Sequence, residues 1–364
     1  MKCITLFSAI TFLVINSYAQ MDLPPSGGNP RATITEEVGI TSITIKYSRP
    51  DVNKREGKIW GELIPYGFAS TNLVTNKNDM PWRAGANENT IISFEHDVKV
   101  EGKNIKAGSY GLSMAVWPDS VIIIFSNQTG AWGSFYYDEK NDALRVKVKP
   151  APLDKSVEYL KYEFIEQKEK YCVIAMQWEK LSIPFKVDVD VDNIVIAKLR
   201  EDVTGQKGFN QLNLVAAANY CLNKNINLEE TLSWAQRAAG LKSFGTLNTL
   251  STAYTKNNKI PQADSTLNEA LIFANPNQYL GSGRAMIAAK RLDRAFEIFN
   301  LNQKKNGDVY AVNAGYMSYY SAIGNFEKAM AYAILALAQS PNDATKKTIE
   351  GNILKLKEGK DINQ

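Results

Sequence analysis

Histidine and cysteine are scarce in this chain, and their scarcity excludes several kinds of active site. The 364 residues include one histidine, His96, and three cysteines. So few ligands, far apart in the sequence, leave no histidine-rich or thiolate zinc set. A Ser-His-Asp triad could use only His96, and neither a Gly-x-Ser-x-Gly elbow nor a Gly-rich phosphate loop is present. We therefore identify no catalytic motif and expect no metal and no cofactor.

A strong excess of one charge is also lacking. The 42 Lys and Arg residues against 38 Asp and Glu give a net charge of +4. This balance argues against nucleic acid or an anionic lipid surface as the main partner. Only Cys172 and Cys221 lie outside the first twenty residues, in different halves of the chain, so we expect no disulfide framework and two buried, unreactive thiols.

The first twenty residues have the pattern of a secretory signal peptide. A basic start, Met1-Lys2, precedes the apolar run Ile4–Ile15 and the small-x-small cleavage sequence Ser17-Tyr18-Ala19. The apolar run is too short for a membrane span, and no later apolar stretch approaches about 20 residues. We therefore expect a signal peptide over residues 1–19 and an extracytoplasmic protein, periplasmic or secreted, without a membrane span.

Residues 20–192 alternate between apolar and polar side chains, which predicts strands. The alternating runs are Ile43–Tyr47, Ile92–Val98, Tyr110–Val116, Val121–Phe125, Leu144–Val148, Cys172–Trp178 and Phe185–Val189. Short turns separate most of them, as in an antiparallel β-sandwich or barrel. We interpret Ile91–Val100 as one strand with His96 on its apolar face, and we expect the longer loop Gly67–Pro81 to project.

The periodicity becomes helical after a linker or helix at residues 193–207. Four segments within 208–364 carry small residues at spacings of 32 to 34, namely Thr231, Ala263, Ala295 and Ala329. Twelve residues before these stand Asn219, Ser251, Gly283 and Met317. This pattern resembles degenerate tetratricopeptide repeats, in which paired helices pack through small residues. A plain helical bundle is the alternative. The fold class is thus α+β in two domains, each with its own core.

Several strings in the first domain resemble a known family. They are Ile43–Pro50, Ile59–Gly67, Trp82–Glu88, Ala107–Leu112, Trp132-Gly133 with Tyr137-Asp138, and Leu144–Val146. In this order they are similar to an uncharacterised bacterial secreted β-domain family, domain of unknown function twenty-nine eleven, over about residues 22–190. The chain departs from the family between Gly67 and Trp82, where the family usually has a very short link. The resemblance implies a β-fold and no assigned activity.

The polar and aromatic residues of these strings form a candidate ligand site. They are Arg49, Trp82, Arg83, Asn87, Glu88, Trp132, Tyr137, Asp138 and Arg145. Aromatic faces with directed Arg and Asn donors suit a sugar, a peptide or a carboxylate. The alternative is structural: Arg83–Glu88 and Arg49–Asp138 would be ion pairs that hold loops on the sandwich. Trp60, Trp82 and Trp132 would then belong to the core.

Two functions follow from these patterns. The first is an exported two-domain binding protein whose helical repeats bind a protein or peptide, with a small polar ligand or glycan as a further candidate for the β-domain. Counting from the repeat positions, the side chains that face the concave groove are Asn248, Thr252, Arg284 and Ser318. The second is a carboxylate-dependent hydrolase of glycan or peptide with Glu88 and Asp138 as the acids, a chemistry that needs two carboxyls about 5–10 Å apart.

The signal peptide gives the first testable prediction. The protein recovered from its native host should begin near Gln20, because signal peptidase cleaves after a small residue such as Ala19. Mass spectrometry of the intact protein measures this directly. Retention of Met1 in the mature protein would contradict the extracytoplasmic location.

Overall fold

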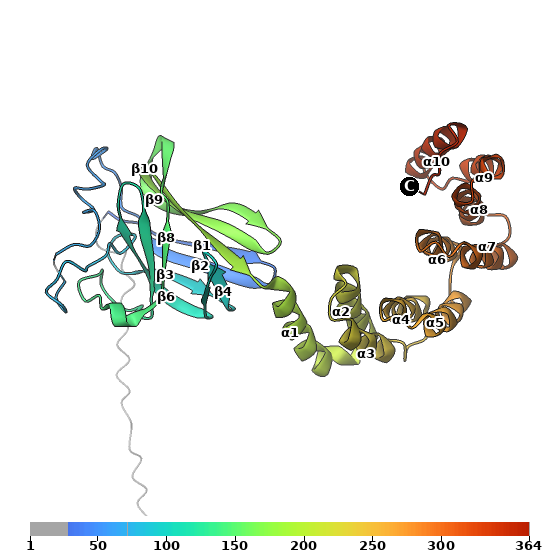
Figure 1. Ribbon diagram of the computed structural model, residues 1–364, viewed down its shortest axis with the longest axis horizontal. Coiled ribbons are helices and arrows are strands. Elements are labelled where there is room, and N and C mark those ends of the chain that lie inside the picture. Colours follow the sequence, from blue (N-terminus) through green and yellow to red (C-terminus); the bar gives the residue numbers. More distant parts are fainter. Residues whose placement is uncertain (1–27, 71, 364) are drawn as a thin grey trace, which may run out of the picture. The chain divides into compact units, whose positions relative to one another are not determined.

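The structure is a computed structural model that describes residues 28–70 and 72–363 (Figure 1). The predicted signal peptide, residues 1–19, lies outside the described residues. The described chain divides into two compact units between Val195 and Ile196. Among the described residues, no helix combines the length and the apolar character that a membrane crossing requires.

The first unit is built from two antiparallel sheets. The six-stranded sheet has the order β1-β2-β3-β6-β7-β8, and the four-stranded sheet the order β5-β4-β10-β9. The strands are β1 (Arg31–Val38), β2 (Thr41–Ser48), β3 (Thr90–Phe94), β4 (Val98–Val100), β5 (Lys103–Ile105), β6 (Gly108–Val116), β7 (Val121–Ser126), β8 (Asp142–Val148), β9 (Ala151–Lys168) and β10 (Tyr171–Val189). The predicted antiparallel β-domain is confirmed.

The core of this unit lies between the two sheets. Because side chains alternate along each strand, one face of the strand is directed into this space. Ile43 and Ile45 of β2 are fully buried, whereas Lys46, the next residue, is exposed. Phe125 of β7 meets Phe185 of β10 edge to face, with ring centroids 6.3 Å apart. Inward side chains of both sheets therefore form one apolar cluster.

The predicted strand Ile91–Val100 is wrong in one respect. It is two strands, since β3 ends at Phe94 in one sheet and β4 begins at Val98 in the other. His96 lies in the crossing, with Nδ1 3.1 Å from Thr41 Oγ1. Apolar alternation continues through the crossing because both sheets face the same core, so the sequence pattern does not reveal the change of sheet.

Another expectation also needs correction, and one strand is irregular. The single long strand β10 has a bulge at Glu179, which has φ +52° and whose buried carboxylate accepts the Gly57 N–H at 2.9 Å. The loop Gly67–Pro81 does not simply project. Asn72 in its middle is buried and donates to the carbonyl oxygen of Tyr137 at 3.0 Å, which anchors the loop to the unit.

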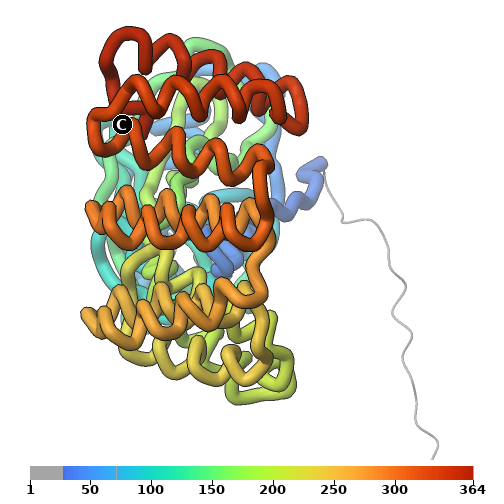
Figure 2. Tube along the Cα trace, turned by 90° about the vertical axis from the view of Figure 1, so that its right-hand side faces the viewer, coloured from blue at the N-terminus to red at the C-terminus, as the bar shows by residue number. Residues whose placement is uncertain are grey.

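The second unit is helical (Figure 2). A short 3-10 helix, η1 (Glu139–Asn141), belongs to the first unit; the helices that follow are α1 (Val191–Thr204), η2 (Gln206–Phe209), α2 (Gln211–Lys224), α3 (Leu228–Ala238), α4 (Phe244–Lys256), α5 (Ile260–Ile272), α6 (Pro276–Ala288), α7 (Leu292–Asn306), α8 (Tyr310–Ala322), α9 (Phe326–Ala338) and α10 (Asp343–Lys357). From α2 to α9 they form four successive pairs. The first helix of each pair lies on the inner side of the arc of this unit and the second on the outer side (Figure 1).

The small residues of the predicted repeats lie on the second helices, α3, α5, α7 and α9. Thr231, Ala263, Ala295 and Ala329 are all at most 2% exposed. Ser251, twelve residues before Ala263, donates its hydroxyl to the carbonyl oxygen of Ala263 at 2.8 Å, which joins α4 to α5. The tetratricopeptide-like interpretation is therefore confirmed: the helices are paired, and the equivalent small residues are buried on the second helix of each pair.

Phe299 of α7 shows how strictly this packing depends on small residues. It is fully buried between two glycines on neighbouring helices, Gly283 of α6 and Gly315 of α8. A Cβ added at Gly283 would lie 2.2 Å from Phe299 Cε1, and one added at Gly315 would lie 2.5 Å from Cδ1. The ring occupies the space that the missing side chains leave.

Gly283→Ala should therefore destabilise the helical unit, by about 1–3 kcal/mol for an overpacked core site. Gly281 on the same helix is the matched control because an added Cβ there meets nothing within 4 Å. Gly281→Ala should be neutral or stabilising by up to about 1 kcal/mol, since alanine favours helix over glycine. Urea unfolding followed by circular dichroism measures both changes. Equal stability of the two variants would contradict the packing described for Phe299.

Candidate functional site

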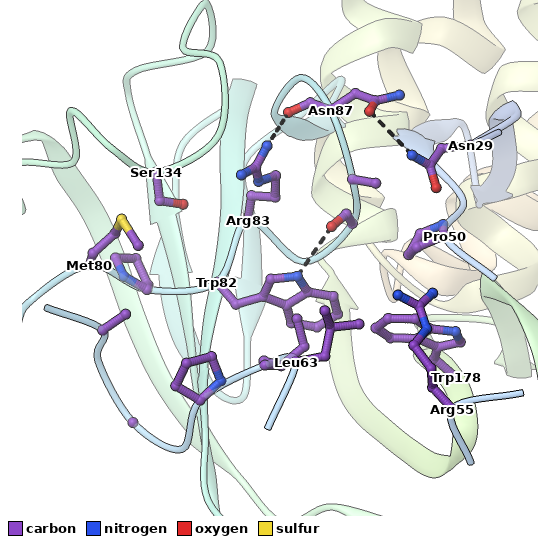
Figure 3. Close-up of a pocket in the computed structure, with 17 residues that line it drawn as sticks. Asn29, Pro50, Arg55, Leu63, Met80, Trp82, Arg83, Asn87, Ser134 and Trp178 are labelled. Atoms are coloured by element: carbon purple, nitrogen blue, oxygen red, sulfur yellow. Dashed lines mark hydrogen bonds between the residues drawn. The ribbon is translucent and has the colours of Figure 1, made fainter. Parts of the chain in front are cut away.

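A cavity of about 440 Å³ lies in the β-unit (Figure 3). Its walls come from segments far apart in the sequence: the loop around Leu63, the segment from Met80 to Asn87, Ser134, and Trp178 of β10. A volume of this size falls in the range of roughly 300–1,000 Å³ that holds small molecules. Three of the predicted site residues line it, namely Trp82, Arg83 and Asn87.

The segment Trp82–Asn87 is a fixed bend. The backbone of Trp82 exchanges two hydrogen bonds with Met114 of β6, at 2.8 and 2.7 Å. The chain then reverses through Ala84 and Asn87, which have φ +51° and +58°. Trp82 Nε1 donates to the carbonyl oxygen of Gly85 at 3.1 Å, so the indole is locked against its own bend. Backbone strain at two non-glycine residues is the kind that clusters at functional sites.

Arg83 is held in this bend without a counter-charge. Its Nη1 donates to the carbonyl oxygen of Asn87 at 2.6 Å, and its Cζ lies 5.5 Å from the ring centroid of Phe135. Throughout residues 28–70 and 72–363, no carboxylate forms an ion pair with it. Half-burial lowers the pKa of the guanidinium because the charged form loses solvation. A desolvated cation of this kind is expected to have an anionic partner.

The predicted ion pair between Arg83 and Glu88 is wrong. Glu88 instead pairs with Arg31, whose Nε is 2.5 Å from Oε1, and accepts the hydroxyl of Ser48 at 3.4 Å. The bend explains the difference, because it turns the carbonyl oxygen of Asn87 toward the guanidinium in place of the next side chain. The Arg31 side chain is 61% exposed, so this pair is worth at most about 1 kcal/mol.

The predicted pair between Arg49 and Asp138 is also wrong. Arg49 Nε donates to the carbonyl oxygen of Leu160 at 2.9 Å, and its guanidinium lies 5.5 Å from the ring centroid of Tyr159. The Asp138 carboxylate caps η1 by accepting the Lys140 N–H at 3.0 Å. Each residue satisfies its polar groups with backbone, which is the commonest partner of a side-chain hydrogen bond.

Tyr137 and Arg145 belong to a separate cluster around Asp142. The Tyr137 hydroxyl donates to Asp142 Oδ2 at 2.6 Å, and Arg145 Nε lies 2.5 Å from the same oxygen. Arg145 Nη2 also donates to the Tyr137 hydroxyl at 2.5 Å. Burial raises the pKa of the Asp142 carboxyl, although both partners act in the opposite direction. The carboxylate is the desolvated member, because its side chain is 9% exposed against 37% for Arg145.

Of the three tryptophans expected in the core, two pack on it and one does not. Trp60 and Trp82 pack on the core, but Trp132 is 61% exposed and does not belong to it. Trp178 takes the third place: its ring centroid is 5.8 Å from that of Trp60 and 6.0 Å from that of Trp82. Sequence reasoning placed Trp178 in an alternating strand and missed its role in the cavity wall, together with those of Ser134 and Arg55. Of these three residues, only Trp178 could have been suspected from the sequence, because it lies on the apolar face of a predicted strand.

Acidic side chains are missing from the cavity wall as the structure describes it. Neither Glu88 nor Asp138 lines it, and no other described Asp or Glu does. Among the residues with described positions, no group of three or more His, Cys, Asp and Glu side chains is arranged to hold a metal ion. The two-acid hydrolase therefore has no geometric support in this cavity.

Comparison with known proteins finds a family match for the β-unit and a structural neighbour that is a TPR protein. The family described as a protein of unknown function (DUF2911) matches residues 29–187, which confirms the resemblance indicated by the motifs. No curated protein matches the chain. Among solved structures, the chain is similar to the crystal structure of YrrB, a TPR protein with an unusual peptide-binding site, at 15% identity and a TM-score of 0.28. The match covers 44% of this chain and 84% of that chain.

The cluster around Asp142 gives a stability prediction with a neighbouring control. Tyr137→Phe removes a donor from a buried carboxylate and should destabilise the β-unit by about 1–3 kcal/mol. Tyr136 is 57% exposed, and Tyr136→Phe should change stability by no more than about 0.5 kcal/mol. Thermal unfolding of both variants compares them. A Tyr137→Phe protein as stable as Tyr136→Phe would show that the cluster does not hold the β8 end of the sheet.

Proposed function

From a chain that joins a DUF2911 domain to tetratricopeptide-like repeats, we propose an exported binding protein whose helical unit binds a peptide segment of another protein. The export is supported by the sequence of the first twenty residues, with a basic start, an apolar run and a small-residue cleavage site. The binding is supported by the paired helices, because stacked helix pairs form concave surfaces suited to chain segments.

The groove residues counted from the repeats support this proposal. Asn248 and Thr252 of α4 line a hollow of about 360 Å³, and Arg284 of α6 and Ser318 of α8 line a second hollow of about 730 Å³. Arg284 Nε donates to the buried Ser318 hydroxyl at 3.1 Å, which joins α6 to α8 beside this hollow. Three of these four side chains are neutral hydroxyls or amides and one is a cation, a combination that suits the backbone and polar side chains of a peptide.

The observation that carries the proposal is a non-helical segment of the chain itself that is hydrogen-bonded to α8 at the edge of the second hollow. Residues Asp361–Asn363 are non-helical and line this hollow beside α8. The Ile362 N–H donates to the Ser321 hydroxyl at 2.9 Å, and that hydroxyl donates to Asp361 Oδ1 at 2.8 Å. Asn363 Nδ2 donates to the carbonyl oxygen of Ser318 at 2.9 Å. The inner helices thus offer both donors and acceptors to a non-helical peptide.

The alternative, a carboxylate-dependent hydrolase, is less well supported. Its two proposed acids, Glu88 and Asp138, are engaged with Arg31 and with the backbone of η1. A general acid and its partner carboxylate must flank a shared substrate site. Because neither of these acids lines the β-unit cavity, binding is the function that the geometry supports best.

Selection of peptides from a displayed random library on the full mature protein tests the groove. Arg284→Ala should lower the affinity for the selected peptides by about tenfold or more, because one charge-assisted hydrogen bond is lost. Lys304 is exposed on the outer helix α7, and Lys304→Ala should leave affinity unchanged. Asp361→Ala removes the acceptor of Ser321 and should strengthen peptide binding, because it loosens the segment that covers part of α8 beside the hollow.

Fluorescence anisotropy with labelled peptides measures these affinities. Selected peptides that bind the Arg284→Ala and Lys304→Ala variants equally would place binding outside the inner helices. Failure of the library to yield any peptide that binds the full protein saturably would contradict the proposed function.

A further inference from the structure

The β-unit cavity has a charge pattern that the peptide groove does not explain. Two guanidinium side chains, Arg55 and Arg83, line it, and no described carboxylate does. Arg55 is already engaged, since its Nη2 lies 3.3 Å from Asp51 Oδ1 and its Nε donates to the carbonyl oxygen of Val52. Among the residues that the structure describes, Arg83 has only a backbone oxygen and an aromatic ring as partners. The cavity therefore contains one uncompensated positive charge.

Two further polar groups in the wall lack partners. Ser134 Oγ and Trp178 Nε1 are buried and form no hydrogen bond with any described residue. Trp178 is 1% exposed and Ser134 6% exposed, so bulk solvent does not reach them freely. Buried donors in folded proteins are nearly always satisfied by protein, ordered water or a ligand. Two unsatisfied groups on opposite sides of one cavity point to an occupant rich in acceptors.

The positions of these groups are fixed by the fold. Arg83 and Ser134 lie on one side of the cavity, and Trp178 lies across it (Figure 3). Gly133, with φ +69°, lies directly against the guanidinium, where an added Cβ would be 2.6 Å from Arg83 Cζ. The glycine thus permits the close approach that brings Arg83 beside the hydroxyl-bearing loop. A site whose donors are held before binding loses little entropy when a ligand enters.

The rest of the wall is apolar. Leu63, Ile64 and Met80 line it with the indole of Trp82. Because Trp82 Nε1 is used by Gly85, this indole contributes apolar surface and no free donor. An apolar wall with a few convergent donors is the usual composition of a small-molecule site.

We propose that this cavity binds a small organic carboxylate with a flat apolar group. Arg83 and Ser134 hold the carboxylate, Trp82 and Leu63 pack against the flat group, and Trp178 Nε1 donates to an acceptor on the far side of the ligand. A single free guanidinium matches a monoanion, and the missing acids leave nothing that would repel it. The site lies wholly in the β-unit, so its validity is independent of peptide binding by the helical unit.

Hippurate is a suitable probe because it combines a carboxylate, a phenyl ring and an amide carbonyl. Isothermal titration calorimetry on the full mature protein should detect saturable binding of hippurate, and binding at least about tenfold weaker for its neutral amide, hippuramide. This comparison needs no variant. Equal affinities for the two compounds, or no saturation by hippurate up to about 10 mM, beyond the weak millimolar range, would overturn the proposal. Tighter binding of phenyl phosphate than of hippurate would overturn it in favour of a phosphate site.

Variants locate the binding. Arg83→Gln should lower the affinity for hippurate by about tenfold or more. Ser134→Ala and Trp178→Phe should lower it by smaller factors. Lys147 is exposed on β8 and outside the cavity, so Lys147→Gln removes an equal charge and should leave the affinity unchanged. Circular dichroism confirms that each variant is folded. If Lys147→Gln lowers the affinity for hippurate as much as Arg83→Gln does, the effect is one of net charge, and the assigned site is contradicted.

Discussion

The carbonyl oxygen of Ala84 is the acceptor on which the architecture of the β-unit site depends. It receives the hydroxyl of Thr90 at 3.1 Å and the hydroxyl of Tyr162 at 2.8 Å. Thr90 belongs to β3 of the six-stranded sheet and Tyr162 to β9 of the four-stranded sheet. Ala84 is fully buried and has φ +51°, so both sheets hold its backbone in an unfavourable conformation. The bend, the direction of Arg83 and the cavity wall all follow from this doubly bonded oxygen.

Local periodicity predicts the elements whose environment is uniform along their length. β2, β6 and β7 were recognised because one face of each is largely buried, and β8 because buried Val146 and Val148 alternate with exposed Lys147. β9 was missed because most of its 18 residues are exposed, so no apolar alternation marks it. The helix pairs were found because close packing of neighbours in sequence requires small residues at a fixed spacing. In each case the result depends on whether burial leaves a regular trace in the sequence.

The partners of charged side chains left no such trace. Arg83 and Glu88 are five residues apart, and a simple reversal would bring them together. Positive φ at both Ala84 and Asn87 gives a different bend, and Glu88 meets Arg31 in its place. Trp178 and Ser134 join the cavity only because β10 and the loop after Ala131 return to the same place. Three of nine predicted ligand residues line the cavity, because contacts across sheets depend on register, which sequence pattern does not determine.

The two proposed sites differ in the physical state of their polar groups. In the helical unit, Ser318 and Ser321 are already hydrogen-bonded to Arg284 and to the segment Asp361–Asn363. A peptide that enters there exchanges existing hydrogen bonds for new ones, and the net gain for each neutral bond is small, about 0.5–1.5 kcal/mol. In the β-unit, Arg83 has lost much of its hydration and has no counter-charge in the described chain. An anion that reaches it displaces no carboxylate of the described chain, so its binding does not have to break an existing ion pair. The groove is thus suited to exchangeable, sequence-tolerant contacts, and the cavity to selective recognition of charge.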